Sequence, residues 1–381
     1  MKYPELACLM TLLVFVYSSC KDKKSNLDNQ GRENISELNP SDFDTIIDGK
    51  TIGLYWLKNK DMHMAMTNYG GRIVGLWVPN NKGTLTDVVI GMGSTEGYKK
   101  STEPYFGATI GRVGNRIARG QFKLEGKEYQ IPVNNGENAL HGGPNGFHEV
   151  VWDVHQKNEQ TLILSYMSPD MEEGFPGTLK VKVIYSLTDS NSLRIEYEAT
   201  TDKPTLVNLT NHAFFNLNGE GSGSILNHQL QINAASYTPV DEGLIPTGVK
   251  VQVEHTPFDF RELHTIRERI NQQDPQLLYG GGYDHNFILN ADISDHAARV
   301  IGDKTGIIMD IFTEEPGLQF YSGNFMEGKN LLKNGSRDDY RTAFCLETQH
   351  FPDAPNHSDF PSIALRPGET YSTVSEYRFS L

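Results

Sequence analysis

Apolar and polar residues alternate with a period of two along much of the chain. Residues 179–187 place Leu, Val and Tyr side chains at every second position, and residues 193–197 repeat the pattern after a polar turn around Ser190 and Asn191. Alternation of this kind predicts an antiparallel β-hairpin with one buried face.

Shorter runs of the same kind recur between loops rich in Gly, Pro, Asn and Asp. They cover residues 162–166, 230–234, 307–312 and 371–379. Only one short stretch, residues 264–270, has a pattern typical of a helix. Many strands, polar turns and few helices predict an all-β fold, a large antiparallel β-sandwich or barrel. The chain shows no repeat of fixed length, which disfavours a propeller.

The first 40 residues lack this alternation. Residues 6–20, "LACLMTLLVFVYSSC", form an apolar run of the length of an export signal, too short to span a bilayer comfortably. Two serines before Cys20 resemble a bacterial lipoprotein signal, in which that cysteine carries the lipid. An ordinary secretory signal is the alternative, because Tyr17 stands where lipoprotein signals usually have Leu and Glu5 weakens the charged start.

Residues 21–40 contain few large apolar side chains and predict a flexible tether. We therefore expect a signal peptide of lipoprotein type over residues 1–20, a tether over residues 21–40 and one β-sandwich domain over residues 41–381. Such a protein would be exported in a bacterium, either to the periplasm or to a membrane that it reaches only through the lipid on Cys20.

Charge narrows the class of ligand. The chain has 34 basic and 48 acidic residues, a formal charge of −14, which disfavours binding to nucleic-acid phosphates and to anionic membrane surfaces. Basic residues interleaved with aromatic ones, as in a nucleic-acid groove, are also missing from the sequence. A neutral small molecule suits this balance better.

Several common chemistries lack their motifs. The sequence has no phosphate-binding glycine loop, no Gly-x-Ser-x-Gly elbow and no paired-cysteine or His-Glu-x-x-His metal site. Twelve histidines could supply metal ligands from distant loops, but surface or core positions are the simpler reading. Cys345 is the one cysteine beyond residue 20, so we expect no disulfide and interpret it as a small core residue without a chemical role. Neither a cofactor nor a metal is expected.

Six polar segments carry a family resemblance. They are "GRVGNRIARG" from Gly111, "NNGENALHGGPNGFH" from Asn134, "NLTNHAFFNLNG" from Asn208, "GGYDHNF" from Gly281, "GLQFYSGN" from Gly317 and "CLETQHFPDAPNH" from Cys345. In these segments, and in this order, the chain resembles the aldose 1-epimerase family, the galactose mutarotases. The resemblance implies the large antiparallel β-sandwich of that family. It also implies interconversion of the α and β anomers of a free aldohexose, such as galactose or glucose, without a cofactor.

The resemblance also assigns roles to seven residues. It makes His212 the acid and Glu347 the base, and it places the sugar-binding side chains at Asn115, Arg116, His141, Asp284 and Gln319. Met171 stands where the family often has Gly, a departure that bears on the rim of the site.

The reaction needs only these residue types. Anomer interconversion removes a proton from the C1 hydroxyl and protonates the ring oxygen, so one base and one acid suffice. The usual pKa values of about 4.3 for Glu and about 6.5 for His make both groups accessible near neutrality.

Each assignment has a structural alternative. His212 could be a hydrogen-bonded core histidine, and Arg112 or Arg119 could bind the sugar in place of Arg116. Further members of the site environment are expected among neighbouring histidines and aromatic residues: His148, His285 and His350 behind the site, and Phe147, Phe214, Phe287 and Tyr321 as a face for the sugar ring.

Three other functions remain open at this stage. A glycoside hydrolase would use Asp284 and Glu347 as its two carboxylates, but would leave His212 without a task. A carbohydrate-binding protein would bind sugar without catalysis. A mutarotase of phosphorylated sugars would need an additional cationic cluster.

Overall fold

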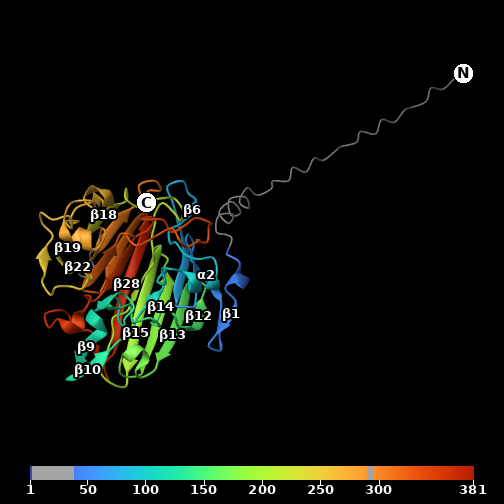
Figure 1. Ribbon diagram of the computed structural model, residues 1–381. Helices are drawn as coiled ribbons and strands as arrows, with labels where there is room; N and C mark the ends of the chain where they lie inside the picture. The colour runs from blue at the N-terminus through green and yellow to red at the C-terminus, as the bar shows by residue number, and fades with distance from the viewer. Residues whose placement is uncertain (2–37, 291–295) are drawn as a thin grey trace. The chain divides into compact units, whose positions relative to one another are not determined.

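The alternating runs form the long strands of a nine-stranded antiparallel sheet (Figure 1). The computed structural model describes Met1 and residues 38–290 and 296–381. The predicted signal peptide lies outside the described residues except for Met1, and the predicted tether lies outside them except for residues 38–40.

The predicted hairpin is confirmed as β14 (Leu179–Leu187) and β15 (Ser192–Thr201). Val183 lies opposite Tyr197 in the antiparallel register. Every second side chain of β14 is buried, while the lysines and Ile184 between them are more exposed. Burial on one face of a pleated strand produces this period of two.

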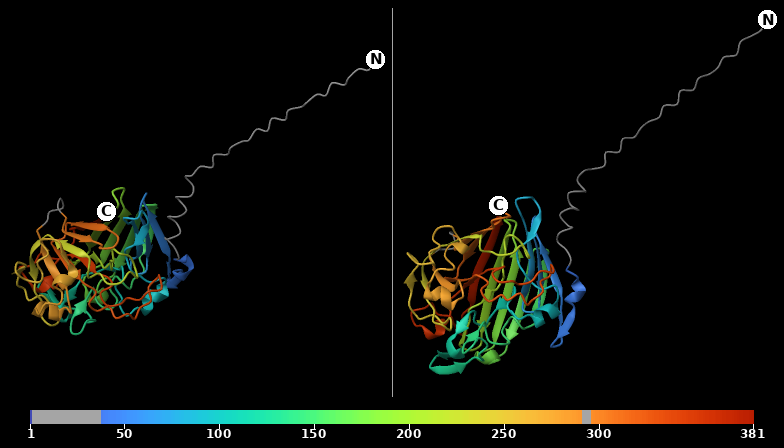
Figure 2. Two further views of the ribbon diagram at one scale, coloured as in Figure 1. Left: turned by 90° about the horizontal axis from the view of Figure 1, so that it is seen from above. Right: turned by 45° about the horizontal axis from the view of Figure 1, so that its top comes forward.

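The nine-stranded sheet contains most of the other predicted strands. Its order is β12 (Asp153–Asn158), β13 (Thr161–Ser168), β14, β15, β28 (Tyr371–Ser380), β24 (Ile308–Thr313), β23 (Ala298–Ile301), β18 (Gln229–Ile232) and β21 (His264–Thr265). Both turned views in Figure 2 show the green strands of this sheet side by side. The last strand in sequence, β28, therefore lies near the middle of the sheet, between β15 and β24.

Two further sheets complete the sandwich. The five-stranded sheet has the order β20 (Val251–Gln252), β19 (Ala234–Thr238), β22 (Asp284–Leu289), β25 (Gly317–Tyr321) and β26 (Cys345–Gln349). The four-stranded sheet has the order β3 (Leu54–Lys58), β4 (His63–Thr67), β5 (Arg72–Pro79) and β6 (Leu85–Asp87). Side chains from all three sheets share one hydrophobic core, among them Met66, Ile73, Val183, Ile195, Leu318 and Leu346. The predicted all-β antiparallel sandwich is confirmed.

Short pairings connect these sheets. They are β1 (Thr45–Ile47) with β2 (Lys50–Ile52), β7 (Thr109–Ile110) with β17 (Thr210–Asn211), β8 (Arg116–Ile117) with β11 (Ala139–Leu140), β9 (Gln121–Leu124) with β10 (Lys127–Gln130), and β16 (Thr205–Leu206) with β27 (Ala364–Leu365). The described residues also form five single turns of 3₁₀-helix: η1 (Pro40–Asp42), η2 (Ala118–Gly120), η3 (Glu172–Gly174), η4 (Ile266–Glu268) and η5 (Ala354–Asn356).

The predicted helix over residues 264–270 is wrong. His264 and Thr265 pair with β18 as the edge strand β21, and only the single turn η4 follows. The segment is too short to gain much from helical hydrogen bonds, and pairing with a sheet edge satisfies its backbone instead. The predicted run 230–234 also divides, because β18 and β19 belong to different sheets.

Two short helices lie where the sequence pattern gave no prediction. They are α2 (Thr95–Lys100), capped by Ser94, and α3 (Pro275–Tyr279), capped by Asp274. Within the part of the chain that the structure describes, neither helix has the length or the apolar character needed to cross a bilayer.

Candidate functional site

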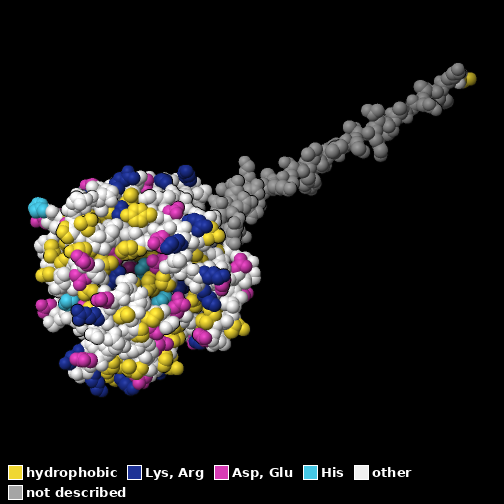
Figure 3. Space-filling view, in the orientation of Figure 1, with side chains coloured by type: hydrophobic (Ala, Val, Ile, Leu, Met, Phe, Trp, Pro, Cys, Tyr) yellow, Lys and Arg dark blue, Asp and Glu magenta, His cyan; other side chains and the backbone are white. Residues whose placement is uncertain are grey.

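A cleft of about 1270 Å³ opens between the five-stranded sheet and the loops that follow β7, β8 and β11. The space-filling view shows such a hollow near the middle of one face, with acidic and histidine side chains in it (Figure 3). The cleft brings together six of the seven residues assigned from the sequence, namely Asn115, Arg116, His141, His212, Asp284 and Glu347. Gln319 lies directly beneath its wall, bonded to Asp284.

One wall is formed by three neighbouring strands of the five-stranded sheet. Gln319 on β25 lies directly opposite Glu347 on β26. Its side-chain Nε2 donates a 2.7 Å hydrogen bond to Oδ1 of Asp284, at the start of β22. Because neighbouring strands hold these three residues in register, their relative positions follow from sheet hydrogen bonding rather than from loop conformation.

The opposite wall is built from tight loops. Asn115 and His141 both have positive φ, 61° and 52°, and the pairing of β8 with β11 holds them next to each other. The backbone N–H of Asn115 donates to Nδ1 of His141 at 3.1 Å. Since Nδ1 accepts this bond, the proton of the neutral imidazole resides on Nε2. His141 therefore offers an N–H donor to a ligand.

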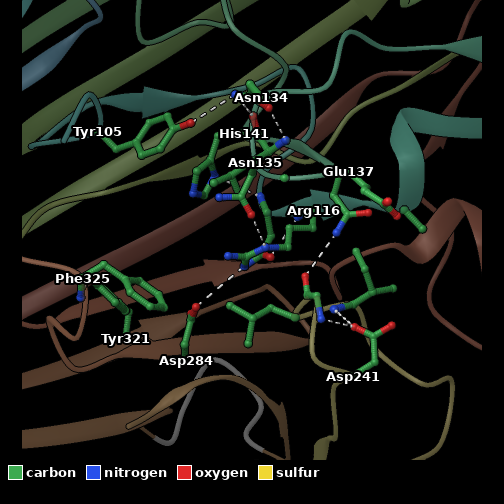
Figure 4. A pocket seen from close by; sticks show the side chains of 18 of the residues that line it. Tyr105, Arg116, Asn134, Asn135, Glu137, His141, Asp241, Asp284, Tyr321 and Phe325 are labelled. Carbon is green, nitrogen blue, oxygen red and sulfur yellow. Dashed lines mark hydrogen bonds and ion pairs between the residues drawn. The ribbon is translucent and has the colours of Figure 1, made fainter. Parts of the chain in front are cut away.

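Arg116 connects the two walls (Figure 4). Its Nη1 lies 3.7 Å from Oδ2 of Asp284, and its Nε donates to the side chain of Asn135 at 3.0 Å. The alternative residue Arg112 lies elsewhere in a purely structural position, because its guanidinium donates to Ser168 and to buried backbone carbonyls. The other alternative, Arg119, lines the rim of the cleft.

His212 follows β17 at the floor of the cleft. Its Nε2 lies 3.6 Å from Oε1 of Glu347, and the two side chains are only 7% and 3% exposed. Its Nδ1 lies 3.4 Å from Sγ of Cys345. The ring packs against Phe214 at 4.9 Å and edge-on to His141 at 5.1 Å. His212 is thus buried, as a core histidine would be, but one ring nitrogen faces a carboxyl group.

Burial shifts the pKa values of these groups in opposite directions. Burial, reinforced by the charge of Asp284 and opposed by Arg116, raises the pKa of Glu347 well above its usual value. Burial lowers the pKa of His212 to about 3. Burial and the neighbouring His212 lower the pKa of His141 well below its usual value. Burial therefore disfavours the charged form of each of these groups.

The same three side chains could also hold a metal ion. Among the described residues, His141, His212 and Glu347 are the one group whose potential ligand atoms all lie within 4.8 Å of one another. Two imidazoles and a carboxylate are also the groups that a proton-transfer site uses.

Sequence analysis missed many cleft residues and included aromatic residues that lie elsewhere. Among the missed residues are Glu103, Tyr105, Asn134, Asn135 and Phe325. Of the four predicted aromatic side chains, Tyr321 lines the cleft, Phe214 packs behind His212, and Phe147 and Phe287 belong to the hydrophobic core. Asn134 and Asn135 could have been found from the sequence, because they lie in the segment "NNGENALHGG" that also contains the assigned residue His141.

The predicted neighbouring histidines divide into two groups. His148 packs edge-on to the cleft residue Tyr105 at 4.8 Å, and His285 accepts a hydrogen bond at Nδ1 from the backbone N–H of Asp284. These two support the site from behind. His350 points away from it, because its Nδ1 lies 2.6 Å from Glu315 beside a different hollow.

Comparisons with known proteins find relatives that match most of the chain. The family profile described as aldose 1-epimerase matches residues 53–378. The chain is 42% identical to rat galactose mutarotase over 334 residues, 87% of this chain and 95% of the rat protein. It is 38% identical to an aldose 1-epimerase of Escherichia coli over 337 residues, 87% and 96% of the two chains. A crystal structure of an aldose epimerase homologue from C. elegans superposes with a TM-score of 0.80 at 31% identity, covering 86% of this chain and 99% of the other.

These relatives correct the location expected from the sequence. The run ending at Cys20 predicted an exported, lipid-anchored bacterial protein, whereas the matching relatives include galactose mutarotases of rat and human, which point away from that assignment. The prediction rested on a short apolar run with two mismatches, Glu5 and Tyr17, and such short motifs often match by chance.

Proposed function

The chain belongs to the aldose 1-epimerase family, and we propose that Glu347 and His212 are the base and the acid of its reaction. The protein is an isomerase that interconverts the α and β anomers of aldoses. The observation that carries the residue assignment is the 3.6 Å separation between His212 Nε2 and Glu347 Oε1 on the buried floor of the cleft.

These two groups account for both proton transfers of the reaction. Glu347 takes the proton of the C1 hydroxyl while His212 protonates the ring oxygen, and the bond between C1 and the ring oxygen breaks to give the open-chain aldehyde. Rotation about the C1–C2 bond presents the other face of the carbonyl. The steps then reverse: His212 recovers its proton from the C5 hydroxyl, and Glu347 returns its proton to the carbonyl oxygen.

The separation of the two groups suits this chemistry. Both reacting oxygens are bonded to the same carbon, so the acid and the base must be close neighbours. A distance of 3.6 Å is within ion-pair range but too long for a direct hydrogen bond, which leaves both groups available to the sugar. The burial of both side chains strengthens their electrostatic influence on the reacting atoms.

Glu347 and His212 together carry one proton before ring opening and one proton after it, as the reaction requires. In one state the proton is on His212 and Glu347 is a carboxylate; in the other, Glu347 is protonated and His212 is neutral. Ring opening starts from the first state and leaves the pair in the second, whose two neutral side chains are favoured by burial. The open-chain intermediate corresponds to that state, so the site does not accumulate charge when the ring opens.

The remaining assigned residues supply hydrogen bonds for the sugar hydroxyls. His141 offers its Nε2–H and Arg116 its guanidinium, while Gln319 Oε1 and Glu347 Oε2 are buried acceptors without a partner among the described residues. Buried polar atoms of this kind are normally satisfied in a folded protein or its complex. A hydroxyl-rich ligand would satisfy them. Galactose is the substrate we propose, because the rat and human relatives are named galactose mutarotases.

The other functions considered from the sequence have less support. Asp284 accepts a hydrogen bond from Gln319 and forms an ion pair with Arg116. These contacts hold its carboxylate in place and disfavour the protonated form that a glycoside hydrolase would need as its acid. The lining of the cleft has two arginines, Arg116 and Arg119, no lysine and six carboxyl groups, a balance that repels a sugar phosphate.

Polarimetry tests the proposal. Freshly dissolved α-D-galactose and α-D-glucose are followed with the wild-type protein and with Glu347→Gln, which removes the base at almost unchanged size. We expect accelerated decay to the equilibrium rotation with the wild type, faster for galactose, and a loss on the order of 100-fold or more in Glu347→Gln. Full activity in Glu347→Gln would refute the base assignment.

A further inference from the structure

The two imidazoles in the cleft differ in what their Nδ1 atoms contact. Nδ1 of His141 accepts from the backbone N–H of Asn115. A backbone N–H can only donate, so protonation of this Nδ1 would bring two hydrogens face to face. Nδ1 of His212 instead contacts the thiol of Cys345 at 3.4 Å. A thiol can both donate and accept a hydrogen bond.

We propose that Cys345 is a positioning residue that allows His212, rather than His141, to alternate between neutral imidazole and imidazolium. The proposal rests on the acid role proposed for His212 above. It goes beyond that role by identifying what fixes the tautomer of the acid and why one of two adjacent imidazoles carries it.

The thiol suits both states of the ring. When His212 is protonated, Nδ1–H donates to a lone pair of the Cys345 sulfur, and Nε2–H faces Glu347 and the cleft. When Nε2 gives its proton to the ring oxygen of the sugar, Nδ1 keeps its hydrogen and the same bond to the sulfur. The ring therefore keeps its position in both states. Burial raises the pKa of Cys345 well above its usual value, with Glu347 reinforcing the shift, so the sulfur keeps its hydrogen.

The strand that carries the base also fixes the thiol. Cys345 and Glu347 are the first and third residues of β26, opposite Tyr321 and Gln319 of β25. Side chains two residues apart on a strand point to the same face. One strand therefore places both partners of His212, the sulfur on Nδ1 and the carboxyl on Nε2. A weak, neutral sulfur partner also adds no charge that would compete for the proton.

Two substitutions at Cys345 separate this role from simple packing. Cys345→Ala removes the hydrogen-bonding atom, and Cys345→Ser restores a group that donates and accepts. We measure kcat and KM for galactose by polarimetry, and the tautomer of His212 by nitrogen NMR of histidine-labelled protein, with the His212 signals identified by their loss in His212→Asn. Leu346→Val is the matched control, because Leu346 is equally buried in β26 but belongs to the hydrophobic core rather than to the cleft.

In Cys345→Ala we expect kcat to fall on the order of tenfold, part of the roughly 100- to 10,000-fold that a general acid contributes. KM should stay within about twofold, since no sugar contact is lost. The His212 signals should change from the Nδ1–H tautomer to a mixture, Cys345→Ser should recover most of the kcat, and Leu346→Val should match the wild type in both readouts.

The outcomes separate this inference from the proposed function. Activity in His212→Asn at the wild-type level would overturn the acid assignment and this inference with it. An inactive His212→Asn, together with wild-type kcat and an unchanged His212 tautomer in Cys345→Ala, would overturn the role of Cys345 alone. Equal losses of kcat in Cys345→Ala and Leu346→Val would also overturn it, because they would show that Cys345 acts only through packing.

Discussion

The single proton shared by Glu347 and His212 determines how catalysis should respond to pH. Burial lowers the pKa of His212 to about 3 and raises that of Glu347, so the pair holds one proton between those two limits. A second proton binds only below the lower limit, and the last one leaves only above the upper limit. We expect kcat to be level through pH 6.5, where an ordinary histidine titrates.

The measurement is kcat for galactose between about pH 4.5 and 8, with the rate in Glu347→Gln subtracted as the uncatalysed background. A loss of activity on the acid side with a midpoint near the usual histidine pKa of about 6.5 would show that the imidazole titrates independently of the carboxyl group.

Arg116 makes a prediction about binding. Its guanidinium contacts Asn135 through Nε and Asp284 through Nη1, a fork that the single ammonium of lysine does not reproduce. In Arg116→Lys we expect KM for galactose to rise on the order of tenfold with a smaller change in kcat. Initial rates over a range of sugar concentrations test this. A rise of KM in Arg119→Lys but not in Arg116→Lys would show that Arg119, and not Arg116, contacts the sugar.

The family resemblance assigned seven side chains from the sequence, of which the cleft contains six and Gln319 adjoins it. It assigned no role to Cys345, Asn135 or Glu103. Cys345 lies 133 positions from His212 in sequence, and its contact with that ring depends on how β26 packs beside β17. Local spacing contains no information about such a contact, so the sequence suggested only a core cysteine.

At the level of elements, the wall of the site depends on the close approach of three strands, and Gly317 on β25 leaves no room for a side chain between its neighbours. A Cβ there would lie 2.4 Å from the side chain of Asn286 on β22 and 3.0 Å from the backbone oxygen of Gln349 on β26. We expect Gly317→Ala to destabilise the protein by about 1–3 kcal/mol through overpacking. It should also weaken sugar binding, because Gln319 lies two residues further along the same strand.

Urea unfolding and KM for galactose are the measurements for Gly317→Ala. The matched control is Gly53→Ala, whose Cβ would meet only ordinary van der Waals contacts. Equal stability of the two variants would show that β25 has room to shift.

Long strands were predictable and short ones were not. Period-two alternation is visible over the eight to ten residues of β13, β14, β15 and β28, and all four were predicted. The pairings that hold His212, Asn115 and His141 are two residues long and contain no period at all. These short pairings form because the packing of the larger sheets brings their flanking loops together, and local sequence does not encode that packing.

On the scale of the whole molecule, a buried ion cluster joins distant parts of the chain. Lys333 Nζ lies 2.5 Å from Glu220 and 3.0 Å from Asp87. Burial raises the pKa of Asp87 to about 6 although Lys333 acts to lower it. Burial alone would lower the pKa of Lys333, but the two carboxylates outweigh it and raise that pKa.

Lys333→Met should therefore cost about 3–5 kcal/mol of unfolding free energy, since it leaves two buried carboxylates without a counter-charge. An Asp whose pKa is raised by folding binds its proton more tightly in the folded state, so acid relieves the defect. Thermal unfolding at about pH 7.5 and about pH 5 should show a smaller deficit at the lower pH.

The control for Lys333→Met is Lys182→Met, which removes a half-exposed lysine paired with Glu198 at the surface. We expect Lys182→Met to change the free energy of unfolding by no more than about 0.5 kcal/mol at either pH. A deficit in Lys333→Met that does not depend on pH would mean that lost packing, rather than unpaired charge, is responsible.

The position of β28 has a consequence for biosynthesis. Residues Tyr371–Ser380 leave the ribosome after the other eight strands of the nine-stranded sheet, yet they form the seam between β15 and β24. Until they emerge, the nascent chain has two half-sheets with open edges, and open edges recruit strands of other chains. Glu347 is also translated late, after His212 and all five assigned sugar-binding residues. Catalytic competence and protection against aggregation therefore arrive together, after the rest of the sheet has been translated.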